Sequence, residues 1–275
     1  MSEKTELTII QPKKGWVSLD VREILRYRDL LYFLVWRDIK VRYKQTAIGV
    51  AWAVVQPFMS MVVLSVIFGR WVKMPSEGYP YPIFIFAGLL PWTFFANAIG
   101  ACANSVVGSS SLLTKVYFPR LVIPMASVGA GIIDFLISLV VMFLLMFHYG
   151  VQWHMGLLAL PFLFLAVLFT ALGIGTFFSA LIVAYRDFRY VIPFVLQLWM
   201  FVTPVIYSPE LFPEKWRWTF NLNPMAGLID GFRSSFLGQS FHPGAFMMSF
   251  SVSVALFFIG VGYFRQVEKD FADII

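Results

Sequence analysis

The chain has 275 residues, of which 59% are hydrophobic and only 13% are charged, and its formal net charge is +6. A soluble domain is typically about 45–50% apolar and about 25% charged, so a soluble enzyme and a disordered chain are both excluded. The single cysteine, Cys102, excludes a disulfide scaffold. The composition therefore predicts a polytopic membrane protein.

The first 46 residues carry charges throughout, and the stretch from Asp20 to Tyr43 is predicted to form an amphipathic helix. Such a helix is expected to lie along the inner membrane surface; the alternative is a simple basic anchor to anionic lipid. The segment lacks the apolar core and cleavage site of a signal peptide, so the first span is expected to remain as an anchor. The apolar residues that recur on one helical face are Ile24, Tyr27, Leu31, Leu34 and Val35.

Six apolar runs approach the length of about 20 residues that a spanning helix needs. Because the runs are continuous rather than alternating, they predict an all-α helical bundle and not a barrel. The spans are predicted at about 47–69, 83–104, 121–147, 157–184, 191–207 and 245–264. Together they form one transmembrane domain, 47–264, between a cytoplasmic segment, 1–46, and a cytoplasmic tail, 265–275.

The distribution of basic residues predicts that both termini lie in the cytoplasm. With this orientation the inner segments hold 16 of the 21 Lys and Arg residues, in keeping with the enrichment of basic residues on the cytoplasmic side. Topology thus accounts for the positive charge, and no nucleic-acid partner is expected.

Two connecting segments differ from plain loops. Residues 109–120 place Leu112 and Leu113 beside Lys115 in a short amphipathic piece, which suggests docking to a partner, although a plain connector is the alternative. Residues 208–244 are too apolar for a free loop, and Asn223 with Pro224 is a typical helix start. The second segment is interpreted as outer re-entrant or interfacial helices; a surface-lying decoration is the alternative.

The spans offer one carboxylate, Asp134. Burying it is costly, so it is expected to face the bundle, either as a proton or substrate site or as a hydrogen-bonded tie between helices. The chain lacks a phosphate-binding loop, a zinc-protease motif and a serine elbow, and its three histidines are scattered in outer loops. No catalytic residue, metal site or bound cofactor is therefore expected, and the energy for transport must come from another subunit.

Several short motifs, in order along nearly the whole chain, resemble the permeases of bacterial polysaccharide ABC exporters. They are Tyr27-Arg28-Asp29-Leu30-Leu31, Arg37-Asp38, Val41-Arg42-Tyr43-Lys44-Gln45-Thr46 with Gly49, Trp52 and Pro57, Lys115-Val116-Tyr117-Phe118-Pro119-Arg120 with Pro124, Tyr185-Arg186-Asp187, and Asn223-Pro224 with Arg233. The resemblance implies a homodimer in the bacterial cytoplasmic membrane with two ATPase subunits, which bind ATP and magnesium. Membrane lipids surround the dimer, and the implied cargo is a lipid-linked polysaccharide such as O-antigen, teichoic acid or capsule.

The resemblance also implies residue roles. Contact with the ATPase is expected from Tyr27 and Arg28, from a coupling helix around Leu112, Leu113 and Lys115, and from an inner loop with Tyr185, Arg186 and Asp187. Aromatic rings that stack on sugar faces are hypothesised to line the translocation path: Trp52, Phe58, Trp92, Phe95, Trp199 and Phe201. Two other functions stay open, namely drug or lipid export by an ABC permease, and a proton-coupled flippase or intramembrane enzyme centred on Asp134.

Overall fold

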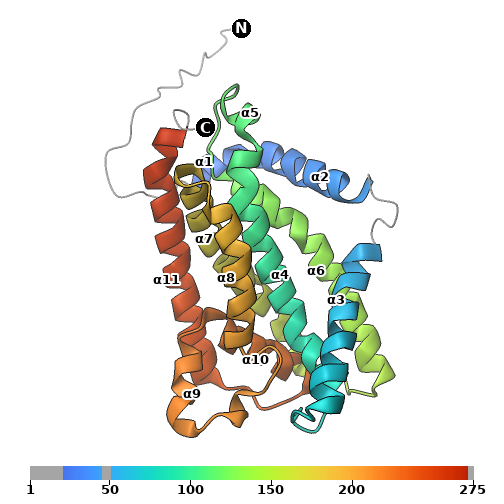
Figure 1. The fold of residues 1–275 in the computed structure, drawn as a ribbon. Coiled ribbons are helices and arrows are strands. Elements are labelled where there is room, and N and C mark those ends of the chain that lie inside the picture. The colour runs from blue at the N-terminus through green and yellow to red at the C-terminus, as the bar shows by residue number, and fades with distance from the viewer. Residues whose placement is uncertain (1–20, 45–50, 272–275) are drawn as a thin grey trace.

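A computed structural model describes residues 21–44 and 51–271, and within these ranges every regular element is helical. Figure 1 shows a bundle of long, roughly aligned helices with α2 lying across one end. The all-α expectation is confirmed. In chain order the helices are α1 Val21–Arg26, α2 Arg28–Lys44, α3 Ala51–Leu64, α4 Tyr81–Gly108, α5 Ser110–Leu113, α6 Val122–His148, α7 Leu160–Ala184, α8 Phe188–Val202, α9 Glu214–Asn221, α10 Pro224–Leu237 and α11 Pro243–Val267.

In the described part of the chain, five helices are long and apolar enough to cross a membrane: Ala51–Trp71, Tyr81–Gly108, Val122–His148, Met155–Ala184 and Pro243–Val267. The first combines α3 with the π-helix Ser65–Trp71, and the fourth combines the 3-10 turn Met155–Ala159 with α7. Each of the five overlaps a span predicted from the sequence. The predicted span 191–207 corresponds to α8, which has only 15 residues and falls short of the roughly 20 that a span needs.

Helix α8 is short because its backbone leaves the helix at Thr203, before Pro204. Thr203, Val205 and Ile206 are nevertheless almost fully buried. Buried carbonyl groups need partners, and distant side chains supply them here. Arg233 of α10 donates to the Val205 and Tyr207 carbonyls at 2.6 and 3.2 Å, and the Tyr81 hydroxyl donates to the Ile206 carbonyl at 2.6 Å. The uncharged run thus continues beyond the helix as buried, irregular backbone.

Helix α4 is the central element and packs against α6 and α7, with further contacts to α3, α8 and α10. Helices α7 and α11 approach closely because both carry glycine where they cross. A Cβ atom added to Gly260 would lie 1.9 Å from the Gly173 carbonyl oxygen, and one added to Gly173 would lie 2.4 Å from the Phe257 Cα. Close crossings at small residues are typical of helices that pack inside membranes.

The predicted N-terminal helix is present as α1 and α2, with a break at Tyr27. The apolar stripe of α2 packs on protein: Leu34 is buried with Phe118 and Val122, and Tyr27, Leu31 and Val35 lie against the same cluster. On the rest of its surface α2 exposes Tyr32, Phe33 and Trp36. The apolar face of the N-terminal helix, which was expected to lie on the membrane surface, therefore packs against α6.

Candidate functional site

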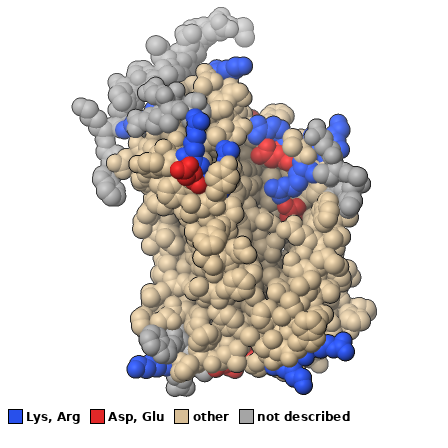
Figure 2. Space-filling view, in the orientation of Figure 1, with Lys and Arg blue, Asp and Glu red and all other residues tan. Residues whose placement is uncertain are grey.

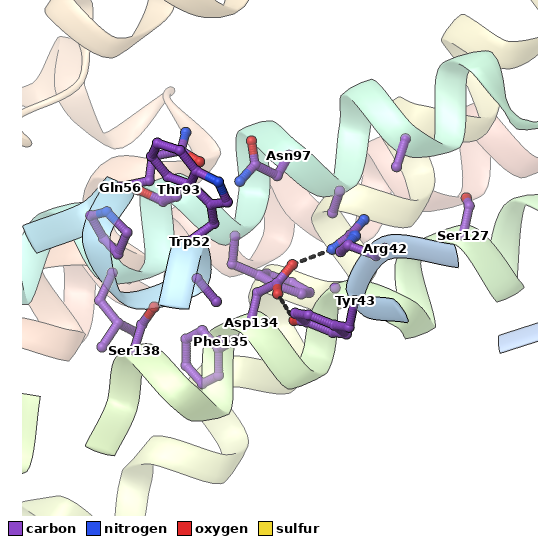
Figure 3. A pocket seen from close by; sticks show the side chains of 17 residues that line it. Arg42, Tyr43, Trp52, Gln56, Thr93, Asn97, Ser127, Asp134, Phe135 and Ser138 are labelled. Carbon is purple, nitrogen blue, oxygen red and sulfur yellow. Dashed lines mark hydrogen bonds and ion pairs between the residues drawn. The ribbon is translucent and has the colours of Figure 1, made fainter. Parts of the chain in front are cut away.

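A pocket of about 410 Å³ opens between the end of α2 and helices α3, α4 and α6 (Figure 3). Trp52 and Gln56 border it from α3, Thr93 and Asn97 from α4, and Ser138 from α6. Its lining is therefore aromatic and neutral polar, except at the end that Arg42 and Asp134 close.

Asp134 is held by two residues of the N-terminal helix. Its two carboxylate oxygens accept hydrogen bonds from Arg42 and from the Tyr43 hydroxyl (Figure 3). Burial, and then the hydrogen bond to Asp134, raise the pKa of Tyr43, so the phenol stays protonated and remains a donor. The only carboxylate of the predicted spans thus ties α6 to α2, as the structural alternative for Asp134 expects.

A second pocket, of about 470 Å³, lies on the other side of α4, against α8. Trp92, Asn104 and Gln197 border it, and Asn97 and Ala101 border both pockets. The two pockets together, called the α4 groove below, therefore meet along one stripe of α4. Among the lining residues of the second pocket none is charged.

The six aromatic path candidates have different environments. Trp52 borders the first pocket and Trp92 the second, but Phe95 is fully buried and Phe58 packs against the core. Phe95 and Trp199 meet edge to face with ring centroids 5.4 Å apart, and the Trp199 indole donates to Asn223. Phe201 is exposed on the outward face of α8. Only Trp52 and Trp92 line the groove in this conformation.

The hypothesis of an aromatic path did not include the neutral polar residues that border the groove. They are Gln56, Thr93, Asn97, Ser127, Ser138, Asn104 and Gln197. On α4 they recur at residues 93, 97 and 104, beside the small residues Gly100 and Ala101. This one-sided stripe of amides and small residues on an otherwise apolar helix was a usable signal in the sequence.

The coupling candidates gather at one end of the bundle, called the α5 end below, where α1, α2, α5 and the start of α8 meet (Figure 1). Tyr185, Arg186 and Asp187 are exposed there, and Arg28 forms an exposed ion pair with Asp29. Figure 2 shows that, on the face it presents, charged residues collect at the two ends and leave an uncharged belt between them.

Leu112 and Leu113 do not form a fully exposed apolar surface for a partner. Both are half-buried against α2 and the start of α6, because they share the cluster of Leu34 and Phe118. The exposed apolar residues of this segment are instead Val116 and Tyr117, next to exposed Lys115. A partner that docks here would touch residues 115–117 first.

The described residues contain no cluster of three or more His, Cys, Asp or Glu side chains able to hold a metal ion. An apolar helical bundle with a largely uncharged groove and charged residues at its two ends is typical of a membrane protein of the transporter class. The model of the family described as "ABC-2 type transporter" matches residues 29–237, so the chain belongs to this family. It is therefore a transport subunit of the cytoplasmic membrane and not an enzyme; in such systems ATP is hydrolysed by a separate subunit.

Similar proteins are named as polysaccharide permeases. The chain is 32% identical over 260 residues to the O-antigen export system permease protein RfbA of Myxococcus xanthus, covering 93% of this chain and 98% of that one. It is 27% identical over 261 residues to the protein of the same name from Klebsiella pneumoniae, with 94% and 100% coverage. The polysialic acid transport protein KpsM of Escherichia coli is 22% identical over 243 residues, with 85% and 91% coverage.

Proposed function

We propose that the chain is the permease subunit of an ABC exporter that moves a lipid-linked cell-surface polysaccharide across the cytoplasmic membrane. The names of similar proteins, O-antigen export permeases and a polysialic acid transport protein, support this substrate class. The α4 groove is the structural observation that supports it most. Apart from Arg42 and Asp134 at one end, the groove is uncharged, and its amides, hydroxyls and aromatic rings suit sugars, because hydroxyl groups need hydrogen-bond partners and the apolar faces of sugars stack on rings.

The proposed topology has six spans with both termini in the cytoplasm. In it α8 and the buried segment 203–208 together form the fifth span, and α9 and α10 are outer helices, with α10 re-entrant. Buried non-helical backbone in a membrane requires protein partners, and Arg233 and Tyr81 provide them. Helix α2 lies at the inner interface, where exposed Tyr32, Phe33 and Trp36 suit the headgroup region.

The proposed assembly is a homodimer with two ATPase subunits, which hold ATP and magnesium. The span made of α3 and the π-helix Ser65–Trp71 is the least buried of the candidate spans and exposes Trp52, Val63 and Trp71. Helix α8 exposes Phe194 and Phe201 on the other side of the α4 groove. A second copy that covers these two helices would close the groove into a path.

An added indole tests the groove. Ala101 borders both pockets, so we expect Ala101→Trp to block the groove and to abolish surface polysaccharide in a deletion strain complemented with the variant. The control is Leu144→Trp, which adds a large side chain at an exposed position of α6. Normal expression with no surface polymer for Ala101→Trp, and normal polymer for the control, supports the proposal. Normal polymer with Ala101→Trp contradicts it.

A further inference from the structure

The C-terminal end of α11 folds back into the protein. After Val267 the chain makes a 3-10 turn, Glu268–Asp270, and then buries the ring of Phe271, which is 1% exposed. The Phe271 ring stands edge-on to that of Phe264, with centroids 5.3 Å apart. These residues were expected to belong to a plain cytoplasmic tail, but the Phe271 side chain is packed as part of the bundle.

Phe271 reaches the segment that links α5 to α6. Its cluster contains Val106 at the end of α4 and Leu121 at the start of α6, with Ile24 of α1 and Leu113 of α5 packed against it. The Arg120 guanidinium also lies over the Phe271 ring, 5.9 Å from its centroid. The cluster of Phe271 therefore reaches Leu113 near one end of the residue 110–120 segment, and the Phe271 ring itself lies under Arg120 at the other end.

Charges surround this contact. Burial raises the pKa of Glu268, while the nearby guanidinium groups of Arg265 and Arg120 act in the opposite direction and Glu23 of α1 raises it further. The Nη1 atom of Arg120 is buried and makes no hydrogen bond to any described residue. The contact of Arg120 with the C-terminal turn is therefore the Phe271 ring, and the charge of Glu268 lies nearby.

The residue 110–120 segment cannot hold its own position. Helix α5 has only four residues, and a helix that short is not stable alone. It is held on one side by α2, through Leu112, and on the other by the Phe271 cluster, through Leu113. A docked protein can transmit force only through an element that keeps its position under load. The contacts that support segment 110–120 therefore affect how ATP hydrolysis is coupled to transport.

We infer that Phe271 and Arg120 are positioning residues that hold the ATPase-docking segment 110–120 in place, so that ATP hydrolysis is converted into transport. The inference rests on the proposed function and adds a role for the C-terminal turn. Neither residue needs to touch the ATPase: Phe271 is buried, and it acts through Leu113 and Arg120.

The test uses the full complex of the permease with its ATPase in membranes, and measures polymer exported per ATP hydrolysed. This ratio does not depend on the amount of folded complex, so a purely structural defect leaves it unchanged. For Phe271→Ala we expect the ratio to fall by about threefold or more, while Phe271→Leu restores most of it. The matched control is Phe258→Ala, which removes an exposed phenylalanine of α11 and should keep the wild-type ratio.

A second pair of variants covers the case in which Phe271→Ala does not fold. Arg120→Leu removes the cation over the ring and should lower the same ratio, and Arg120→Lys should recover part of it. An unchanged ratio in Phe271→Ala or, if that does not fold, in Arg120→Leu overturns the inference. A wild-type chain that binds no ATPase, or whose export needs no ATP, instead overturns the proposed function.

Discussion

Arg233 shows how one side chain can replace a turn of helix. Its guanidinium lies 4.0 Å from the centroid of the Phe84 ring and donates to two carbonyls of the segment after α8. A buried cation is tolerated only when it is well paired, and here two carbonyls and a ring face supply the pairing, while Nε makes no hydrogen bond to a described residue. Gly88 makes room for it, since a Cβ atom there would lie 3.0 Å from both Arg233 and the Val205 carbonyl.

Removing this side chain should destabilise the protein strongly. Arg233→Leu leaves two buried carbonyls without donors, so we expect a loss of about 2–5 kcal/mol. Arg233→Lys should recover only part of this, because an ammonium group lacks the planar fork of a guanidinium. Thermal unfolding of the purified complex in detergent measures the effect. Exposed Arg70 is the control, and Arg70→Leu should change stability by less than about 0.5 kcal/mol.

Substitutions in the Arg42–Asp134 pair can distinguish the two hypotheses for Asp134, a tie between helices and a proton site. Both side chains are partly exposed, 37% and 27%, so solvent screening limits the pair to about 1 kcal/mol or less. We expect Asp134→Asn to keep transport, and a double-mutant cycle with Arg42→Gln in thermal unfolding to give a coupling energy of that size. Loss of transport in Asp134→Asn with unchanged assembly would instead favour the proton-coupled alternative.

At the scale of the element, helices α7 and α11 can cross closely because the residues at the crossing are glycines, which have no side chain. Gly173 and Gly260 let two backbones touch, so no neighbouring side chain can move aside to admit a methyl group. We therefore expect Gly260→Ala to cost about 3 kcal/mol, at the upper end of the range for overpacking.

Its matched control lies two residues further along α11. A Cβ atom at Gly262 meets nothing within 4 Å, so Gly262→Ala should be neutral or stabilising by up to about 1 kcal/mol. The yield of folded protein after size-exclusion chromatography compares the two variants. Equal yields would mean that the crossing is looser than its geometry indicates.

Most of the long helices could be predicted from the sequence, because a long apolar run without charged residues is easy to recognise. The predicted helix start at Asn223 and Pro224 is found at the start of α10, Pro224–Leu237, where the Asn223 side chain accepts from the Met225 amide. The end of the helix inside the predicted span 191–207 could not be recognised. The buried segment after Val202 is as uncharged as residues 191–202 before it, and its partners Tyr81 and Arg233 lie far away in the chain.

The candidate site was harder to predict than the fold. Two aromatic path candidates, Trp52 and Trp92, do border the groove, whereas Phe95 is fully buried. With 18% aromatic residues in the chain, residue type cannot tell a ring that faces a groove from one in the core. The burial of Leu112 and Leu113 was missed for a related reason, because their partners on α2 lie about 80 residues earlier.

At the scale of the whole molecule, the proposed dimer is formed through the exposed faces of α3 and α8. We expect cysteine pairs that combine α3 positions Met59 or Val63 with α8 positions Phe194 or Leu198 to give disulfide-linked dimers in membranes. Pairing the same α8 positions with exposed Leu144 of α6 should give none. Native Cys102 can remain in place, since it is fully buried. If no α3–α8 pair cross-links, these helices do not form the dimer contact.

The broken end of α8 has a consequence for how the chain is made. Ribosomes deliver α8 and residues 203–208 before Arg233 has been synthesised, so the carbonyls of this segment meet the bilayer without the donor that later satisfies them. We expect α8 to wait at the translocon until α10 emerges, and the two to enter the bilayer as one unit. Biosynthesis of this membrane domain is then sequential up to α7 and concerted after it.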